Sequence, residues 1–150
     1  MSWHNILETA LVTLELSDGD KYQVIEELLD LAVQSGNIKD RDHALKDLIE
    51  REQYLSTGFE NGLAVPHAKS EAVSEIVLAF GLNRQGIEFD SLDGKPTHFV
   101  FMLLSPMDTS GPHIQTLALL ARNFQIAETS QTIKNVATQE ELLQIFRDFK

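Results

Sequence analysis

The chain has 150 residues, which suffices to bury a core, and we expect a single domain over residues 1–150. Its formal net charge of −11 at pH 7 argues against nucleic-acid binding, because that binding relies on Lys and Arg side chains that neutralise phosphates. The absence of cysteine excludes disulfides, thiol catalysis and cysteine metal sites. Apolar runs stay well short of the roughly 20 residues of a membrane helix, and the first residues lack signal-peptide character, so we expect a cytoplasmic protein.

The first third of the chain carries signals for a helix, a half-buried strand, a turn and two more helices, at 2–9, 10–16, 18–20, 21–35 and 41–54. Ser2 is expected to cap the helix at 2–9, and Asp40 is expected to cap the helix at 41–54. Gly36 is expected to stop the helix that precedes it.

The rest of the chain favours strands at 76–82, 86–89 and 99–104, then helices that begin near residues 112, 129 and 138. The run 99–104 is the most apolar and predicts a central strand. Pro112 suits a first helical position, and Thr138 with Glu141 forms a capping-box pattern. One apolar stripe is expected to face the core from the first of these helices: Ile114, Leu117, Ala118, Ala121 and Phe124. This order predicts an α/β domain, a mixed sheet with helices packed on its faces.

The segment most suggestive of chemistry is Leu63–His67, in which three apolar residues lead into proline and then histidine. Pro66 fixes its own φ and pushes Val65 towards extended backbone. The preceding loop holds Gly58 and Gly62, which permit turns closed to other residues. His67 is therefore aimed at a fixed point, either as a reactive group or as a hydrogen-bonded structural residue.

Several other polar side chains allow two interpretations each. His113 falls in the first turn of a predicted helix, where unpaired N–H groups favour anions, so it either helps to hold a phosphoryl oxygen or only decorates the helix start. Arg51 either clamps an oxyanion, or interacts with the negative end of its helix or pairs with a carboxylate. Ser56 and Thr57 supply hydroxyls near His67, and such hydroxyls more often serve turns.

The other histidines are less suggestive. His4 and His43 are expected on the surface and His98 at a sheet edge. Counting alone leaves open a zinc site formed by His67, His98, His113 and a carboxylate, although no ligand pair has short spacing. Patterns for P-loops, zinc proteases and serine hydrolases are absent from the sequence.

These residues together resemble the signature of the fructose/mannitol class of phosphotransferase-system enzyme IIA domains. The first matching block is Arg51-Glu52, Ser56-Thr57-Gly58-Phe59 and Asn61–Ala68. The second is the strand 99–104, the Ser105-Pro106 turn and the helix start Gly111-Pro112-His113. The resemblance covers nearly the whole chain and implies a mixed five-stranded sheet flanked by helices on both faces.

The resemblance also implies roles for individual residues. His67 corresponds to the phosphoryl acceptor, while His113 and Arg51 correspond to residues that stabilise the phosphoryl group. Thr57 corresponds to a hydroxyl-bearing binding residue. One departure is Glu60, where family members usually have a small residue, most often glycine. A carboxylate that pointed inward there could repel a phosphoryl group, and one that faced solvent would not.

The implied function is a phosphoryl relay. An HPr-type carrier protein donates to His67, which passes the group to an EIIB component, and EIIB phosphorylates a sugar at the membrane permease. Neither a metal nor a cofactor is expected, and contact with the membrane is indirect. Three alternatives stay open: a nitrogen-related regulator that binds targets according to His67 phosphorylation, a binding protein that has lost phosphoryl transfer, and a metal hydrolase.

Overall fold

The computed structural model describes residues 6, 7 and 9–150, so the expected Ser2 cap and His4 lie outside the described residues. The elements within the described residues follow in chain order: β1 (Leu11–Thr13), α2 (Lys21–Ala32), η1 (Val33–Ser35), α3 (Arg41–Tyr54), β2 (Leu63–Ala64), β3 (His67–Lys69), β4 (Val77–Ile87), β5 (Thr97–Ser105), α4 (Gly111–Phe124), α5 (Ala127–Lys134) and α6 (Gln139–Arg147). None of these helices has both the length and the apolar character needed to cross a membrane.

The five strands form one mixed sheet, with the order β1-β4-β5-β2 and with β3 also paired to β5. β4 and β5 run antiparallel, β1 runs parallel to β4, and β2 and β3 run parallel to β5. The predicted central position of the 99–104 run is therefore confirmed. The expectation for His98 is wrong, because this residue lies on the central strand β5, where its Nδ1 is 2.9 Å from the Asn83 carbonyl oxygen.

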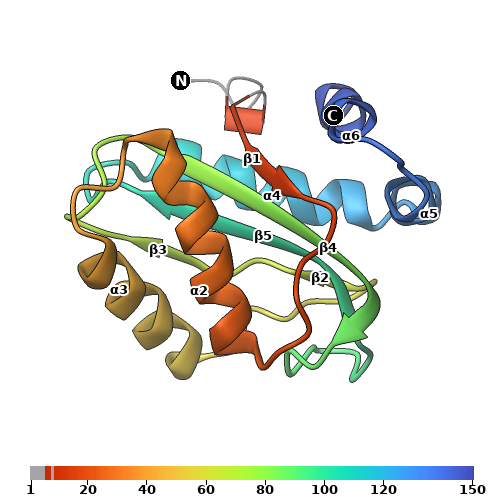
Figure 1. Ribbon diagram of the computed structural model, residues 1–150, viewed down its shortest axis with the longest axis horizontal. Coiled ribbons are helices and arrows are strands. Elements are labelled where there is room, and N and C mark those ends of the chain that lie inside the picture. The colour runs from red at the N-terminus through yellow and green to blue at the C-terminus, as the bar shows by residue number, and fades with distance from the viewer. Residues whose placement is uncertain (1–5, 8) are drawn as a thin grey trace.

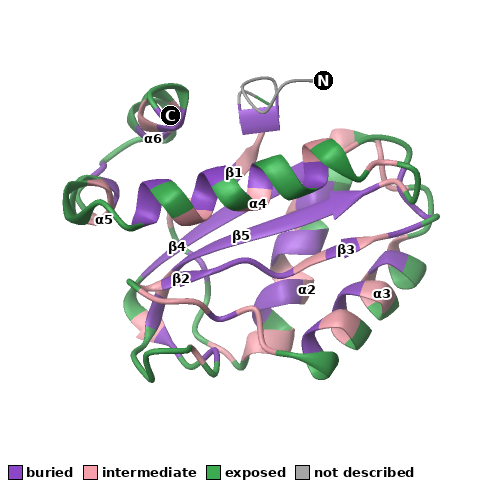
Figure 2. Cartoon of the chain, turned by 180° about the vertical axis from the view of Figure 1, so that it is seen from behind, coloured by how far each residue is buried: buried purple, intermediate pink, exposed green. Residues whose placement is uncertain are grey.

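Helices cover both faces of the sheet, as predicted. α2 and α3 lie in front of it in Figure 1, and α4 lies on the opposite face, which Figure 2 turns towards the viewer. The side chains of β5 alternate between two separate hydrophobic cores, one on each face of the sheet. Those of Phe99, Phe101 and Leu103 pack on the α4 and α6 side, and those of Val100, Met102 and Leu104 pack on the α2 and α3 side. His67 is paired in register with Leu103, on the strand next to β5.

Two strands expected at 76–82 and 86–89 are one long strand, β4, with a register shift between Leu82 and Ile87. The Asn83 side chain stabilises the irregular stretch, because its Oδ1 accepts the backbone N–H groups of Gln85 and Gly86 at 3.0 and 2.8 Å. The side chain thus replaces hydrogen bonds that the ladder loses at a bulge.

The core-facing side of α4 matches the predicted apolar stripe only in part, since Phe124 is buried and Leu117 packs against the core. The buried residues are His113, Thr116, Leu119, Leu120, Asn123 and Phe124, while Ile114 is 63% exposed. Two of these polar side chains can be buried because they bond to carbonyls of their own helix: Thr116 Oγ1 to Pro112 (2.8 Å) and Asn123 Nδ2 to Leu119 (2.9 Å). The true buried face therefore contains polar groups that a hydrophobicity pattern excludes.

The predicted helix ends are largely confirmed. Gly36 ends the region of α2 and η1 with φ of 79°, and Asp40 caps α3 by accepting a backbone N–H. Thr138 caps α6, but the Glu141 carboxylate reaches the N–H of residue 137 instead of the N-cap N–H, so this capping box is incomplete. A complete capping box occurs instead at α2, around Asp20.

Candidate functional site

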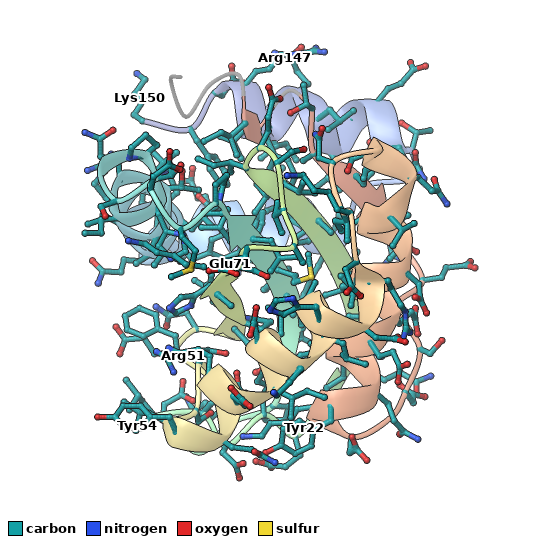
Figure 3. The ribbon with its side chains drawn as sticks, turned by 90° about the vertical axis from the view of Figure 1, so that its left-hand side faces the viewer. Tyr22, Arg51, Tyr54, Glu71, Arg147 and Lys150 are labelled. Atoms are coloured by element: carbon teal, nitrogen blue, oxygen red, sulfur yellow. The ribbon has the colours of Figure 1, made fainter. Side chains whose placement is uncertain are left out.

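A pocket of about 370 Å³ opens beside His67 on the α4 side of the sheet. Its walls come from the end of α3 at Arg51, the following loop at Thr57, and Leu117 and Ala121 of α4. Figure 3 shows Arg51 and Tyr54 on the same edge of the domain, at the C-terminal end of α3. Leu117 and Ala121 belong to the stripe that was predicted to face the core, and both line this pocket.

The segment before His67 holds its ring in a defined tautomer. His67 Nδ1 lies 2.7 Å from the Val65 carbonyl oxygen, and Val65 is buried between β2 and β3. A carbonyl oxygen can only accept, so Nδ1 carries the proton. In the neutral ring, Nε2 then keeps its lone pair, as a nucleophile requires.

The surroundings favour the neutral form of His67. Burial lowers the pKa of this imidazole below its ordinary value of 6.5, and the Arg51 guanidinium adds to the lowering. The hydrogen bond to Val65 and the Glu52 carboxylate act in the opposite direction. The net lowering leaves the ring uncharged near neutral pH.

His113 is brought against His67 from the first turn of α4. The two ring centroids are 5.4 Å apart and the rings meet edge to face. His113 is 6% exposed, and its Nδ1 lies 2.6 Å from Ser105 Oγ at the end of β5. Burial, with smaller contributions from His67 and Lys69, lowers the pKa of His113 to about 4, so two neutral imidazoles face each other.

Arg51 makes the helix-end interaction that was one of its predicted roles, whereas its role as an oxyanion clamp stays a prediction. Its Nη1 donates to the Leu55 carbonyl oxygen at 2.8 Å, which pairs a carbonyl at the C-terminal end of α3. The guanidinium also lines the pocket. Since arginine has five N–H donors, the helix-end bond leaves others available to a bound oxyanion.

The hydroxyls of the loop are both engaged within the protein. Thr57 Oγ1 donates to Glu52 Oε1 at 2.5 Å, and Ser56 Oγ donates to the Phe89 carbonyl oxygen at 2.7 Å. Thr57 lines the pocket, yet its hydroxyl proton points to a carboxylate. Glu60 is half-buried and is not among the residues that line the pocket.

Three further residues contribute to the site, although the sequence analysis assigned no role to any of them: Glu52, Ser105 and Lys69. Glu52 accepts a hydrogen bond from Thr57, and Ser105 is bonded to His113. Lys69 Nζ donates to Ser110 Oγ at 2.7 Å. For Glu52, the sequence shows only a glutamate next to Arg51 at a helix end. Its bonds to Thr57 can be recognised only in the folded structure.

The remaining histidines lie apart from this site. His43 is on the surface, as predicted, with Nε2 3.4 Å from Asp47. His98 is engaged with the Asn83 carbonyl oxygen. Within the described residues, no group of three His, Asp or Glu side chains is arranged to hold a metal ion.

A mixed α/β sheet with one histidine on a strand beside a pocket, and a second at a facing helix start, is the arrangement expected of a phosphotransferase-system IIA domain. The chain belongs to the family described as phosphoenolpyruvate-dependent sugar phosphotransferase system, EIIA 2, whose sequence model matches residues 5–149.

Relatives of two kinds are similar to this chain. The fructose-specific EIIA component of Haloferax volcanii is 40% identical over 138 residues, which span 86% of this chain and 90% of that protein. The nitrogen regulatory protein IIA-Ntr of Neisseria meningitidis has a crystal structure with a TM-score of 0.84 and 30% identity, covering 95% of this chain and 97% of the other. The Escherichia coli mannitol IIA protein, solved in complex with phosphorylated IIB, shares the fold with a TM-score of 0.77 and 16% identity, covering 90% and 92%.

Proposed function

We propose that this protein is a cytoplasmic phosphoryl carrier of the sugar phosphotransferase system. It accepts a phosphoryl group on His67 from an HPr-type phosphocarrier protein and passes the group to an EIIB component. The single observation that carries this proposal is the bond between His67 Nδ1 and the Val65 carbonyl oxygen, because it leaves Nε2 unprotonated.

In this mechanism, the lone pair of His67 Nε2 attacks the phosphorus atom in line. A new N–P bond forms, and the P–N bond to the carrier's histidine breaks, with its electron pair returning to that histidine. The proton on Nδ1 stays shared with the Val65 carbonyl. Since phosphoryl transfer needs mainly positioning and charge stabilisation, no further covalent chemistry is required of the protein.

Stabilisation of the phosphoryl oxygens falls to Arg51 and His113. The free N–H groups of Arg51 supply positive charge and directed hydrogen bonds. His113 is neutral, so it donates from Nε2 when the Ser105 hydroxyl donates to its Nδ1. Thr57 forms part of the pocket wall, so its role in binding the phosphoryl group is to shape the pocket.

The surface around the pocket suits protein partners. Tyr54, Leu55, Leu92 and Ile114 are large apolar or aromatic residues with exposures of 85, 64, 77 and 63%. Apolar side chains around a polar centre favour docking of another protein. An EIIB partner is consistent with the complex known for the Escherichia coli mannitol protein.

A second candidate is a nitrogen-related regulator that binds target proteins according to the phosphorylation state of His67. The similarity to IIA-Ntr of Neisseria meningitidis, at 30% identity over 95% of this chain, favours it. Both functions use the same phosphorylation step. They differ in whether the phosphoryl group moves on to an EIIB protein.

The experiment is incubation with phosphorylated HPr-type carrier bearing radioactive phosphate. We expect the wild-type protein and the surface control His43→Gln to be labelled, and His67→Gln to stay unlabelled. Subsequent loss of label to purified EIIB supports transport. Labelling of His67→Gln, or an unlabelled wild-type protein, contradicts the proposal, and the latter outcome supports a domain that has lost phosphoryl transfer.

A further inference from the structure

A fully buried carboxylate lies directly behind the pocket. Glu52 follows Arg51 on α3, and its side chain has 0% exposure. It is not among the residues that line the pocket. A buried carboxylate is costly unless charge and hydrogen bonds satisfy it, so its partners indicate what it holds in place.

Both oxygens of Glu52 are bound to the loop that follows α3. Oε1 accepts the hydroxyl of Thr57 at 2.5 Å, and Oε2 accepts the backbone N–H of the same residue at 2.9 Å. Such a two-point attachment fixes the backbone and the side chain of Thr57 together. Hydrogen bonds to an ionised group are also roughly twice as strong as neutral ones.

Lys21 supplies the opposing charge. Its Nζ lies 3.3 Å from Glu52 Oε2 and 2.9 Å from Asp90 Oδ2, and its side chain is only 11% exposed. The start of α2, the end of α3 and the loop before β5 therefore meet at Lys21, which forms a buried pair with Glu52 and a second pair with the exposed Asp90. Lys21 thus balances the charge of the Glu52 carboxylate, which limits the repulsion of an incoming phosphoryl group by that carboxylate.

A continuous chain of hydrogen bonds leads from this carboxylate to the reactive ring. Thr57, fixed by Glu52, accepts the N–H of Val65 with its carbonyl oxygen at 3.1 Å. The carbonyl oxygen of Val65 in turn accepts the Nδ1–H of His67 at 2.7 Å. Each residue in this series of hydrogen bonds thus positions the group to which the next residue is bonded.

We propose that Glu52 is a positioning residue for the phosphoryl acceptor: through Thr57 and Val65 it holds the His67 ring in its orientation and Nδ1–H tautomer. This inference rests on the proposed function, since the reaction concerned is phosphorylation of His67 Nε2. A purely structural role for Glu52 would affect stability and leave the ring unchanged.

The test compares Glu52→Gln with Glu50→Gln, which removes an exposed carboxylate from the same helix. An amide of the same shape cannot accept two hydrogen bonds from Thr57 through both of its terminal atoms. We expect the rate of His67 phosphorylation to fall about 10-fold to 100-fold in Glu52→Gln, as for a displaced reacting group. The carrier concentration at half-maximal rate should stay unchanged, because Glu52 has no exposed side-chain surface.

Two readouts on the unphosphorylated protein report on the ring itself. Nitrogen-15 NMR of His67 in Glu52→Gln should show a smaller population of the Nδ1–H tautomer and a lower pKa, because the carboxylate raises that pKa in the wild type. Hydrogen exchange of the Val65 amide should become faster. A wild-type tautomer and a wild-type transfer rate in Glu52→Gln would overturn the proposal.

A second pair of variants keeps the proposal testable if Glu52→Gln fails to fold. Thr57→Val removes the hydroxyl donor and should disturb the His67 tautomer, whereas Thr57→Ser retains the donor and should restore it. Equal tautomer populations of His67 in these two variants would contradict a positioning role for the hydrogen bonds from Glu52 to His67. If the wild-type protein accepts no phosphoryl group, the proposed function fails while the NMR comparison still decides the positioning role.

Discussion

Ser105 Oγ lies 2.6 Å from His113 Nδ1, and both side chains are buried. A neutral imidazole has one donor and one acceptor nitrogen, so this contact decides what the other nitrogen can do. When the hydroxyl donates to Nδ1, the proton of His113 resides on Nε2. The two histidines are then complementary, since His67 has its lone pair on Nε2 and His113 has its proton there.

Ser105→Ala removes the group that sets the His113 tautomer. We expect the phosphorylation rate of His67 to fall about 10-fold, which corresponds to about 1.4 kcal/mol, within the range of one lost hydrogen bond. The measurement is single-turnover labelling by the phosphorylated carrier. Ser70→Ala is the matched control, because Ser70 is equally buried but its hydroxyl accepts from the N–H of Ala72. Equal rates in both variants would refute the assignment.

The low pKa of His113 predicts a particular pH dependence of stability. This pKa is about 4 in the folded protein and 6.5 as its ordinary value. Between these values the unfolded chain binds more protons, so acid favours unfolding, and the free energy of unfolding falls as pH drops from 6.5 towards 4. Urea unfolding of His113→Gln should therefore show a smaller loss between pH 7 and pH 4.5 than the wild type. An unchanged loss would speak against a buried neutral His113.

Gly58 lies where its backbone approaches another loop closely. A Cβ atom at this position would stand 2.4 Å from the Phe89 carbonyl oxygen and 3.0 Å from Ser91 Cα. Gly58→Ala should lower the free energy of unfolding by about 1–3 kcal/mol, because backbone atoms must move. Gly111→Ala, with open space around its Cβ position, should change it by about 0.5 kcal/mol or less. Urea titration of both variants tests the difference.

The exposed apolar side chains around the pocket predict a separate effect on partner binding. Leu92 lines the pocket and is 77% exposed. Leu92→Asp should raise the concentration of carrier needed for half-maximal labelling several-fold and leave the rate at saturation nearly unchanged. Ile126→Asp, at a 52% exposed residue beyond the end of α4, should leave both unchanged. Equal effects of the two substitutions would contradict docking at this surface.

Much of the fold could be predicted because its signals are local. The α3 helix has the predicted bounds, and Asp40 caps it as expected. The continuous apolar run of β5 marked it as the central strand. Predictions failed where side chains replace backbone partners, as Asn83 does in β4, and where buried polar residues such as Thr116 bond within α4. Such bonds depend on tertiary contacts that periodicity does not report.

The candidate site divides in the same way. The resemblance to IIA domains singled out His67, Arg51 and His113, each of which had two open interpretations from residue type and position alone. The fold brings the three residues together from three different elements. Glu52 and Ser105 make hydrogen bonds to Thr57 and His113, respectively. Their relevance depends on which side chain lies within hydrogen-bonding distance, and that follows only from the packed arrangement of β5, α3 and α4.

The fixed bond from His67 Nδ1 to the Val65 backbone has a consequence for signalling. Because the opposite nitrogen would receive the phosphoryl group, loading and unloading need no rearrangement of the strand that bears the ring. The phosphorylated and unphosphorylated forms would thus have the same backbone conformation. A downstream protein that discriminates between them must then sense added negative charge and bulk at the pocket mouth, and not a change in conformation.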